Sequence, residues 1–209
     1  RTDIFGTRVL LEVAKERKIE RYVQISTDEV YGDIDAGQFS KETDRLHPSS
    51  PYAASKAAGD LMVLAYVRTY DVPALITRCT NNLGPNQYPE KFIPLAFTNL
   101  FEGKPLPVYG DGANIRDWLF VRDHCEAICQ VLEKGRSGEV YNVAGRAEWE
   151  MDIKAYSDLV LKAVGRDDSQ VTYKDAEPFT THVKHIDCSK AIRDLKHDPK
   201  VAPEEGIRR

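Results

Sequence analysis

Tyr52 and Lys56 form the first pair of side chains in this chain that could move a proton. They stand four residues apart in a segment with helical spacing, so they share one helix face. The pKa of a tyrosine is ordinarily about 10, and a nearby ammonium lowers it by favouring the phenolate. The pair could therefore take a proton from a hydroxyl. The same spacing also fits a tyrosine in the core beside a lysine that extends to water, so the pair alone is a weak signal.

Asp28 and Glu29 offer a second acid–base pair directly after Thr27. Two adjacent carboxyl groups can divide acid and base work when their pKa values are pushed apart, so that one is protonated and the other ionised. The Thr27 hydroxyl could grip a substrate oxygen together with Tyr52. The alternative is that both carboxylates only cap the loop that follows, and the spacing does not separate these two readings.

A strand end and a helix start must meet for these groups to share one site. The run Arg21–Thr27 predicts a buried strand, and the apolar spacing after Pro51 predicts a helix over residues 51–70. A second buried strand is predicted over residues 73–80, with a turn-rich exit at 81–86. This order is typical of a doubly wound, parallel (Rossmann-like) α/β sheet, in which ligands bind beyond the carboxyl ends of the strands. We therefore expect both strand exits to face one site.

Shorter and more mixed elements follow Pro94 and predict a smaller mixed α/β lobe packed on the sheet. The expected helices cover about 93–101, 124–134 and 152–164, and the expected strands cover 106–109, 118–121, 140–145 and 171–174. Asp152 is expected to cap the third of these helices, and Ser189 to cap a short final helix.

Composition excludes several classes of protein. The 209 residues are 42% hydrophobic and 30% charged, with a formal net charge of −4, which is ordinary for a globular domain with its own core. No long run of one charge sign occurs, so neither nucleic acid nor a membrane surface is an expected partner. No apolar run reaches the roughly 18 residues that a membrane-spanning helix needs.

The cysteines favour a reducing compartment. None of the four forms a spacing typical of zinc ligands, and we expect buried free thiols at Cys79, Cys125, Cys129 and Cys188. Free thiols suit the cytoplasm. His182 and His185 lack a third ligand at a suitable spacing, so no metal site is predicted.

Four motifs together resemble the extended short-chain dehydrogenase/reductase family, and within it the dTDP-glucose 4,6-dehydratases. They are STDEVYG at 26–32, YAASK at 52–56, NNLGP at 81–85 and VYGDGANIRDW at 108–118. The match keeps its order from about Gly6 to Asn142. The triplet Thr27-Asp28-Glu29 is the most specific part, because epimerases and decarboxylases of the family usually carry Ser-Ser or Thr-Ser there.

The resemblance implies an NAD-dependent lyase that removes water from a nucleotide sugar. Tyr52, tuned by Lys56 and helped by Thr27, would take the proton of the sugar 4-hydroxyl during oxidation at C4. Glu29 would then take the C5 proton, and a protonated Asp28 would give its proton to the departing 6-hydroxyl. Reduction at C6 completes the reaction.

The resemblance also implies contacts, partners and domains. The expected substrate contacts are Thr27, Asn81, Lys91, Phe92, Pro107, Val108, Tyr109 and Arg116, and the expected cofactor contacts are Tyr52, Lys56 and Asn82. Residues 1–90 would form part of an NAD-binding domain whose first strands are missing. Residues 91–209 would form mainly a substrate lobe, with some elements returning to the sheet. Family members pair through two long helices, so a homodimer through the helices at about 4–17 and 51–70 is expected.

Three departures from the family pattern leave the nucleotide, dTDP, UDP or another, open. The Gly-rich dinucleotide fingerprint is absent from this chain, which begins at Arg1 within a helical pattern, so we expect the sequence to be cut from a longer protein. Met151 stands where dehydratases usually carry a nucleotide-binding asparagine. The run 177–183 replaces two arginines and a histidine with Glu177, His182 and Thr180.

Two rival functions remain open at this point. A UDP-sugar 4-epimerase or decarboxylase would use the Tyr52–Lys56 pair without needing Asp28 and Glu29 as catalysts. A non-catalytic protein that binds nucleotide sugars would need neither pair.

Overall fold

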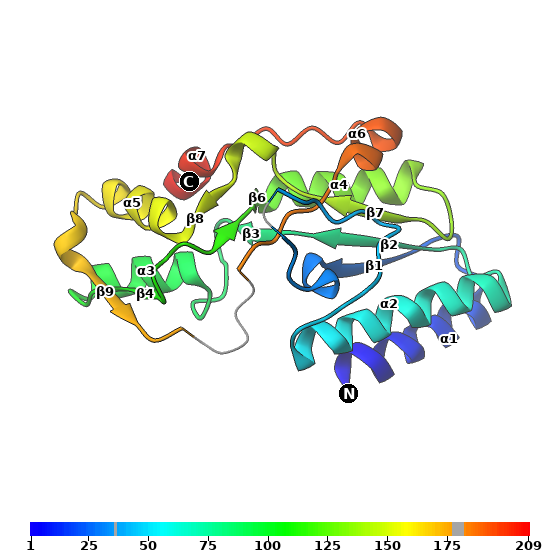
Figure 1. The fold of residues 1–209 in the computed structure, drawn as a ribbon. Coiled ribbons are helices and arrows are strands. Elements are labelled where there is room, and N and C mark those ends of the chain that lie inside the picture. The colour runs from blue at the N-terminus through cyan, green and yellow to red at the C-terminus, as the bar shows by residue number, and fades with distance from the viewer. Residues whose placement is uncertain (36, 177–181) are drawn as a thin grey trace.

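A three-stranded parallel sheet lies at the centre of one half of the molecule (Figure 1). The computed structural model describes residues 1–35, 37–176 and 182–209. Strands β1 (Tyr22–Thr27), β2 (Ala74–Cys79) and β7 (Val140–Val143) run in the order β1-β2-β7, and both neighbouring pairs are parallel. The predicted parallel α/β sheet is thereby confirmed.

Helices cover both faces of this sheet. On one face α2 (Pro51–Tyr70) packs against β1 and β2, and α1 (Thr7–Arg17) lies against α2 after a π-helical turn at Thr2–Gly6. The other face is covered by α4 (Val121–Lys134) and α6 (Ser189–Leu195). Apolar side chains from both layers are buried against the strands. Strands β2 and β7 are buried along their whole length, whereas β1, at the edge of the sheet, is only partly buried.

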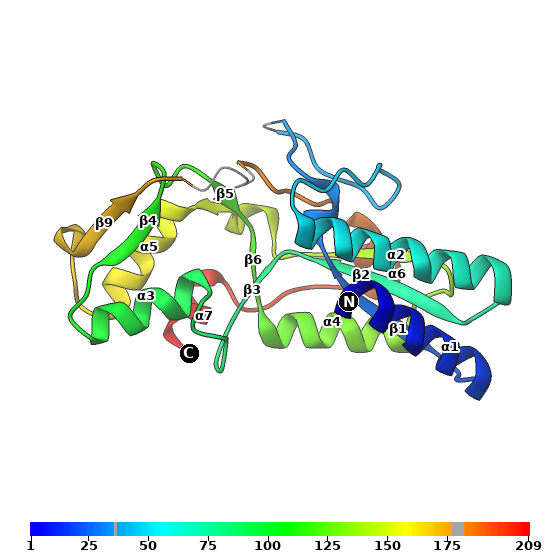
Figure 2. The same cartoon turned by 90° about the horizontal axis from the view of Figure 1, so that it is seen from below.

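A second half of the molecule holds the shorter elements (Figure 2). Its members are α3 (Phe92–Phe101), β4 (Leu106–Tyr109), α5 (Ile153–Ala163), β9 (Val171–Lys174) and α7 (Pro203–Arg208). Strands β4 and β9 pair in parallel. A hydrophobic core of its own, which includes the fully buried Leu106, Tyr156 and Val160, holds this half together.

Two small strand pairs connect the halves. Strand β3 (Asn81–Leu83) pairs in parallel with β6 (Trp118–Phe120), and β5 (Ile115–Arg116) pairs antiparallel with β8 (Met151–Asp152). Figure 2 shows β3 and β6 running side by side between the two halves. The prediction of a turn-rich exit directly after β2 is therefore wrong for the residues of β3. Pairing with a strand distant in the sequence overrides the low strand propensity of the two asparagines.

The two predicted N-caps have different outcomes. The Asp152 carboxylate accepts a hydrogen bond from the Ala155 N–H at 2.7 Å, so its capping role is confirmed. Ser189 does not cap, because α6 begins at Ser189 itself, and the Asp187 carboxylate accepts from the Ser189 N–H at 2.8 Å. The prediction that this helix is the final one is also wrong, since α7 follows it.

The cysteines are free, as predicted, but only Cys79 is fully buried. Cys125 and Cys129 are exposed, because α4 turns His124, Ala127 and Val131 toward the core and these two thiols to the opposite side. Between residues 1 and 209, leaving out positions 36 and 177–181, no helix combines the length and the apolar character that crossing a membrane requires.

Candidate active site

The ends of β1 and β2 and the start of α2 bring the predicted catalytic groups together. Thr27 and Cys79 are register partners at the ends of the two strands, so the residues after them emerge side by side. The Ser50 hydroxyl caps α2 by accepting from the Ala53 N–H at 3.1 Å, and Pro51 occupies the first helical position. Tyr52 consequently lies on the first turn of α2, at the edge of the sheet where the strands end.

A buried polar network fixes these elements to one another. The Arg78 guanidinium on β2 forms an ion pair with Asp60 of α2 at 2.8 Å, and both side chains are almost fully buried. Arg78 also donates to the Tyr31 hydroxyl at 2.8 Å, which in turn donates to Asn142 of β7 at 2.8 Å. Because every member is buried, loss of one leaves an uncompensated charge or polar group inside the fold.

A pocket of about 630 Å³ opens beyond these strand ends. It brings together nine of the residues predicted for the site: Thr27, Glu29, Tyr52, Lys56, Asn81, Asn82, Lys91, Phe92 and Arg116. Other residues line it that were not predicted for the site, among them Ser26 and Trp118 from within the motifs, and Thr80, Gln87, His124 and Ile153 from outside them. The pairing of β3 with β6 places Trp118 opposite Asn81. Helix α4, which follows β6 directly, brings His124 to the pocket.

Asp28 lies behind this pocket rather than in its lining. Its side chain is 4% exposed, and the Thr27 hydroxyl donates to its Oδ1 at 3.1 Å. Burial raises the pKa of Asp28, while the positive charge of Lys184 opposes that rise. The raised pKa favours the protonated form, as expected for a general acid.

Glu29 has a partner that the sequence did not indicate. The Lys184 ammonium donates to Glu29 Oε1 at 2.8 Å, and the Glu29 backbone N–H donates to the Thr27 hydroxyl at 3.3 Å. No motif includes Lys184, and 155 residues separate it from Glu29, so no local pattern could have found this pair.

Tyr52 and Lys56 share the pocket, but their electrostatics differ from the prediction. Burial, followed by the charges of Glu29 and Asp3, raises the pKa of Tyr52 above 10 instead of lowering it. The Lys56 ammonium donates to the Ile25 carbonyl at 2.7 Å. The expectation of a lowered phenol pKa in this structure is therefore wrong, because burial and, after it, the nearby carboxylates penalise the phenolate.

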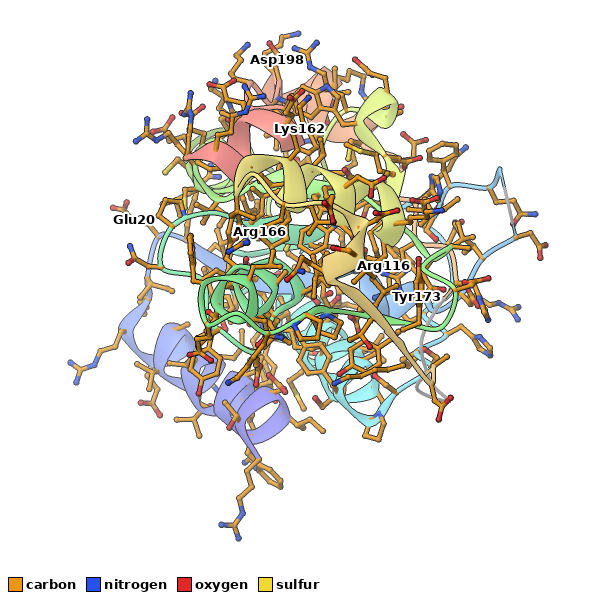
Figure 3. The ribbon with its side chains drawn as sticks, turned by 90° about the vertical axis from the view of Figure 1, so that its left-hand side faces the viewer. Glu20, Arg116, Lys162, Arg166, Tyr173 and Asp198 are labelled. Atoms are coloured by element: carbon orange, nitrogen blue, oxygen red, sulfur yellow. The ribbon has the colours of Figure 1, made fainter. Side chains whose placement is uncertain are left out.

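Arg116 is held deep between the two halves of the molecule. It is 8% exposed, and its Nη1 donates to the carbonyls of Ile115 at 2.7 Å and His182 at 3.3 Å. In Figure 3 it lies toward the middle of the outline, whereas Glu20 and Asp198 lie at the edge. Burial lowers its pKa, and the charges of Asp28 and Glu29 counter that effect. The guanidinium thus stands at the pocket wall with carboxylates nearby.

Three predicted substrate contacts lie elsewhere. Pro107, Val108 and Tyr109 form β4 in the second half of the molecule and do not line the pocket. Val108 is 1% exposed, and Lys174 lies over the Tyr109 ring at 5.8 Å from its centroid. Their role in substrate binding stays a prediction.

The structure describes Met151, one of the residues that depart from the family pattern. Met151 is half-buried on β8, where it is the register partner of Arg116. Glu177 and Thr180 lie outside the described residues. Within the part of the chain that the structure describes, no group of three or more His, Cys, Asp or Glu side chains is arranged to hold a metal ion.

The pocket floor fits a polar ligand. Several buried side-chain atoms of its lining find no hydrogen-bond partner among the described residues: Asn82 Oδ1, Gln87 Oε1, Trp118 Nε1 and His124 Nε2. Buried polar groups are normally paired, so unpaired ones around a pocket are suited to a ligand that carries both donors and acceptors.

A larger cavity of about 950 Å³ lies on the other side of Asp117. Burial raises the pKa values of Asp117 and Glu150, which line it, to about 7. The Asp117 carboxylate accepts from the Gly145 N–H at 3.0 Å. None of the predicted catalytic residues lines this cavity, so the chemistry is assigned to the smaller pocket.

Comparison with known sequences shows the family to which this chain belongs. A sequence profile of the GDP-mannose 4,6 dehydratase family matches residues 1–209. A dTDP-glucose 4,6-dehydratase of an Actinoplanes species is 44% identical over 206 residues, which cover 99% of this chain and 63% of the relative. The chain therefore spans less than two thirds of the length of that relative.

Comparison with solved structures also finds similar proteins. The dTDP-glucose 4,6-dehydratase from Bacillus anthracis in complex with NAD is 43% identical, has a TM-score of 0.94, and is matched over 99% of this chain and 65% of that chain. A UDP-glucuronic acid 4-epimerase from Bacillus cereus in complex with UDP-glucuronic acid and NAD is 28% identical, with a TM-score of 0.92 over 98% of this chain and 64% of that chain. Both share the fold, and the dehydratase shares more of the sequence.

Proposed function

Because the chain belongs to the GDP-mannose 4,6 dehydratase family, we propose that the whole protein is an NAD-dependent nucleotide-sugar 4,6-dehydratase, a lyase that acts on dTDP-glucose. In this proposal residues 1–90 form part of the cofactor-binding domain, and residues 91–209 mainly form the substrate lobe. Strand β7, with α4 and α6, returns from the second part of the chain to the sheet.

The single observation that carries the proposal is the pair Asp28 and Glu29 at the end of β1. Burial raises the pKa of Asp28, and Glu29 is ion-paired with Lys184. One acid and one base are thus available side by side, as loss of water from a sugar requires. An epimerase would leave this pair without a chemical task.

The cofactor would be held by Tyr52, Lys56 and Asn82. The unpaired Asn82 Oδ1 at the pocket floor suits a ligand that carries an amide group, as nicotinamide does. When bound, NAD would supply hydride uptake from C4 and hydride return to C6. Tyr52 would need a positive charge from the bound cofactor to reach the phenolate form, which burial and the protein's own carboxylates disfavour.

Each catalytic side chain has its own proton task, and Glu29 has two. Tyr52 takes the proton of the 4-hydroxyl, with Thr27 aligning that oxygen and Lys56 fixed on the Ile25 carbonyl. Glu29 removes the C5 proton, which the neighbouring ketone acidifies. Asp28 gives its proton to the departing 6-hydroxyl, which leaves as water. Glu29 then returns a proton to C5.

The substrate would lie between the strand ends and the second half of the molecule. Asn81, Lys91, Phe92 and Arg116 line the pocket there. The planar Arg116 fork suits a diphosphate, because it can pair two oxygens at once. The three β4 residues Pro107–Tyr109 are proposed to contact the nucleotide end.

Product analysis of the full-length protein tests the proposal. With dTDP-glucose we expect a 4-keto-6-deoxy sugar nucleotide, detected by mass spectrometry and NMR. Glu29→Gln should lower product formation by about 100-fold or more, because general base catalysis contributes about that much. Glu102→Gln, at an exposed glutamate on the second half of the molecule, should leave the rate unchanged.

The epimerase-like alternative predicts a different result. A 4-epimer or a pentose as the product, with Glu29→Gln retaining most of the turnover, would contradict the dehydratase assignment. Absence of turnover with dTDP-, UDP- and GDP-linked glucose or mannose, together with no NAD in the native protein, would favour a binding role without catalysis.

A homodimer in the cytoplasm is part of the same proposal. Helix α1 and the turn before it expose Phe5, Val9, Leu10 and Val13, each at 46–61% of the maximum. A row of exposed apolar side chains on one helix suits contact with a second copy of the same helix. The free thiols suit a reducing compartment.

A further inference from the structure

Lys184 is a buried lysine placed directly on the catalytic pair. Its side chain is 8% exposed, and its ammonium contacts Glu29 Oε1 at 2.8 Å. Its positive charge also acts on Asp28. A lysine is rarely buried unless its charge is paired, so this position depends on the carboxylates it faces.

The segment around Lys184 is fastened on both sides. On one side the Ile115 N–H donates to the His182 carbonyl at 3.0 Å. On the other side the Val183 N–H donates to Asp33 Oδ1 at 3.0 Å, and the Ser40 N–H donates to the His185 carbonyl at 2.9 Å. Hydrogen bonds thus hold the backbone of this segment between β5 and the loop after Asp28. The Lys184 side chain therefore starts from a fixed point.

We propose that Lys184 is a positioning residue for the water-loss steps, because it holds the Glu29 carboxylate in one orientation at the pocket wall. This inference rests on the proposed dehydratase function. The Glu29 side chain is 34% exposed, so without a partner it would rotate among solvated rotamers. Lys184 itself does not line the pocket, so it acts through Glu29 and makes no contact with substrate there.

Lys184 has a second effect, on the general acid. Asp28 works in its protonated form, so turnover falls as the pH rises through its pKa. The Lys184 charge lowers that pKa, against the larger effect of burial. Removing the charge should raise the pKa of Asp28 and move the alkaline limb of the turnover profile to higher pH. The titratable and charged groups that face Asp28 are Glu29, Tyr52, Cys79, Arg116, Asp117 and Lys184.

The test uses the full-length protein with dTDP-glucose. For Lys184→Met we expect kcat to fall at least 10-fold, KM to change less than 3-fold, and the alkaline limb to move to higher pH. Rapid quenching should show a 4-keto sugar that still carries its 6-hydroxyl, because oxidation at C4 does not need Glu29. Lys184→Arg keeps the charge and should restore part of the rate and the position of the limb.

Lys162→Met is the matched control. Lys162 also pairs with a glutamate, at 3.5 Å from Glu204, but its side chain is 70% exposed on α5. Lys162→Met should leave kcat, KM, the alkaline limb and the rapid-quench products unchanged. If Lys184→Met fails to fold, as judged by its melting transition, Lys184→Gln and Lys184→Arg carry the test.

The outcomes separate the two proposals. A wild-type protein that makes the 4-keto-6-deoxy product, with Lys184 variants that keep its kcat and pH profile, overturns the role of Lys184 alone. Equal loss of rate in the Arg and Met variants with no movement of the alkaline limb also overturns it. A wild-type protein that makes no such product overturns the dehydratase function and this role with it.

Discussion

His124 is a buried histidine whose charge the fold disfavours. It is 7% exposed in the pocket lining, and burial, with the neighbouring His197, lowers its pKa to about 4. The unfolded chain has the ordinary value of 6.5. The unfolded state therefore binds the proton first as the pH falls, and the stability that neutral His124 gives is lost from about pH 6.5 down to about pH 4.

This linkage predicts a pH-dependent difference between the wild type and His124→Gln. Glutamine does not titrate, so the variant should gain about 2 kcal/mol relative to the wild type when the pH falls from 7.5 to 5. Urea unfolding at both pH values measures it. Asp117 and Glu150 titrate with the opposite sign but are present in both proteins. A stability difference between the two proteins that is the same at both pH values would contradict the lowered pKa of His124.

Residue types and spacing could identify the proton-moving groups but not their partners. Thr27, Tyr52 and Lys56 were predicted to share one site, and the pocket contains all of them. The sign of the Tyr52 pKa shift was not predictable, because it depends on how far the fold buries the phenol and on how close Glu29 and Asp3 come in space. Lys184 could not be predicted either, because it meets Glu29 only through the fold, across 155 residues of sequence.

Gly32 ends the 3₁₀ turn that carries Asp28 and Glu29. Its φ is +81°, a conformation that favours glycine, and a Cβ there would lie 2.1 Å from the His47 carbonyl oxygen. The His47 N–H donates to the Val30 carbonyl at 2.9 Å, so the two segments cannot separate freely. The close approach of these backbones sets the position of the turn that carries Asp28 and Glu29.

Gly37 offers a matched control, because its φ is also +81° and a Cβ there meets nothing within 4 Å. Gly37→Ala should cost about 1–2 kcal/mol from backbone strain alone. Gly32→Ala should cost at least about 3 kcal/mol, since the clash is added to the strain, and turnover should fall 10-fold or more. Urea unfolding and product formation measure both effects. Equal costs for the two variants would show that the approach to His47 is unimportant.

Element boundaries were predictable where local chemistry sets them. Ser50 and Pro51 mark the start of α2, and the helix begins there. Strand β3 was not predictable, because its asparagines become a strand only through pairing with β6, more than thirty residues later in the sequence. The exposure of Cys125 and Cys129 likewise depends on which side of α4 meets the sheet.

At the scale of the whole molecule, α1 carries the predicted dimer surface. Val9 and Leu10 are 60% and 57% exposed, and Leu61 on the adjoining α2 is 58% exposed. In the full-length protein, the double variant Val9→Glu with Leu10→Glu should dissociate a dimer into monomers, because charges would be buried without partners. Light scattering coupled to gel filtration measures the mass.

Ile192→Glu is the control for this prediction. Ile192 is 55% exposed on α6, on the opposite face of the sheet from α1, so its replacement should leave the dimer intact. A monomeric wild-type protein, or a dimer that persists in the double variant, would show that α1 is not the interface.

The contact between Glu29 and Lys184 can form only late in the synthesis of the protein. The two residues are 155 positions apart, and a ribosome adds about 5–20 residues per second. Roughly 8–30 seconds therefore pass between the synthesis of Glu29 and that of Lys184. Strand β1, helix α2 and strand β2 can meet on the nascent chain well before then. The Glu29 carboxylate, however, gains its lysine partner only after residue 184 has been made, so a growing chain carries Thr27, Asp28 and Glu29 before it can form this ion pair.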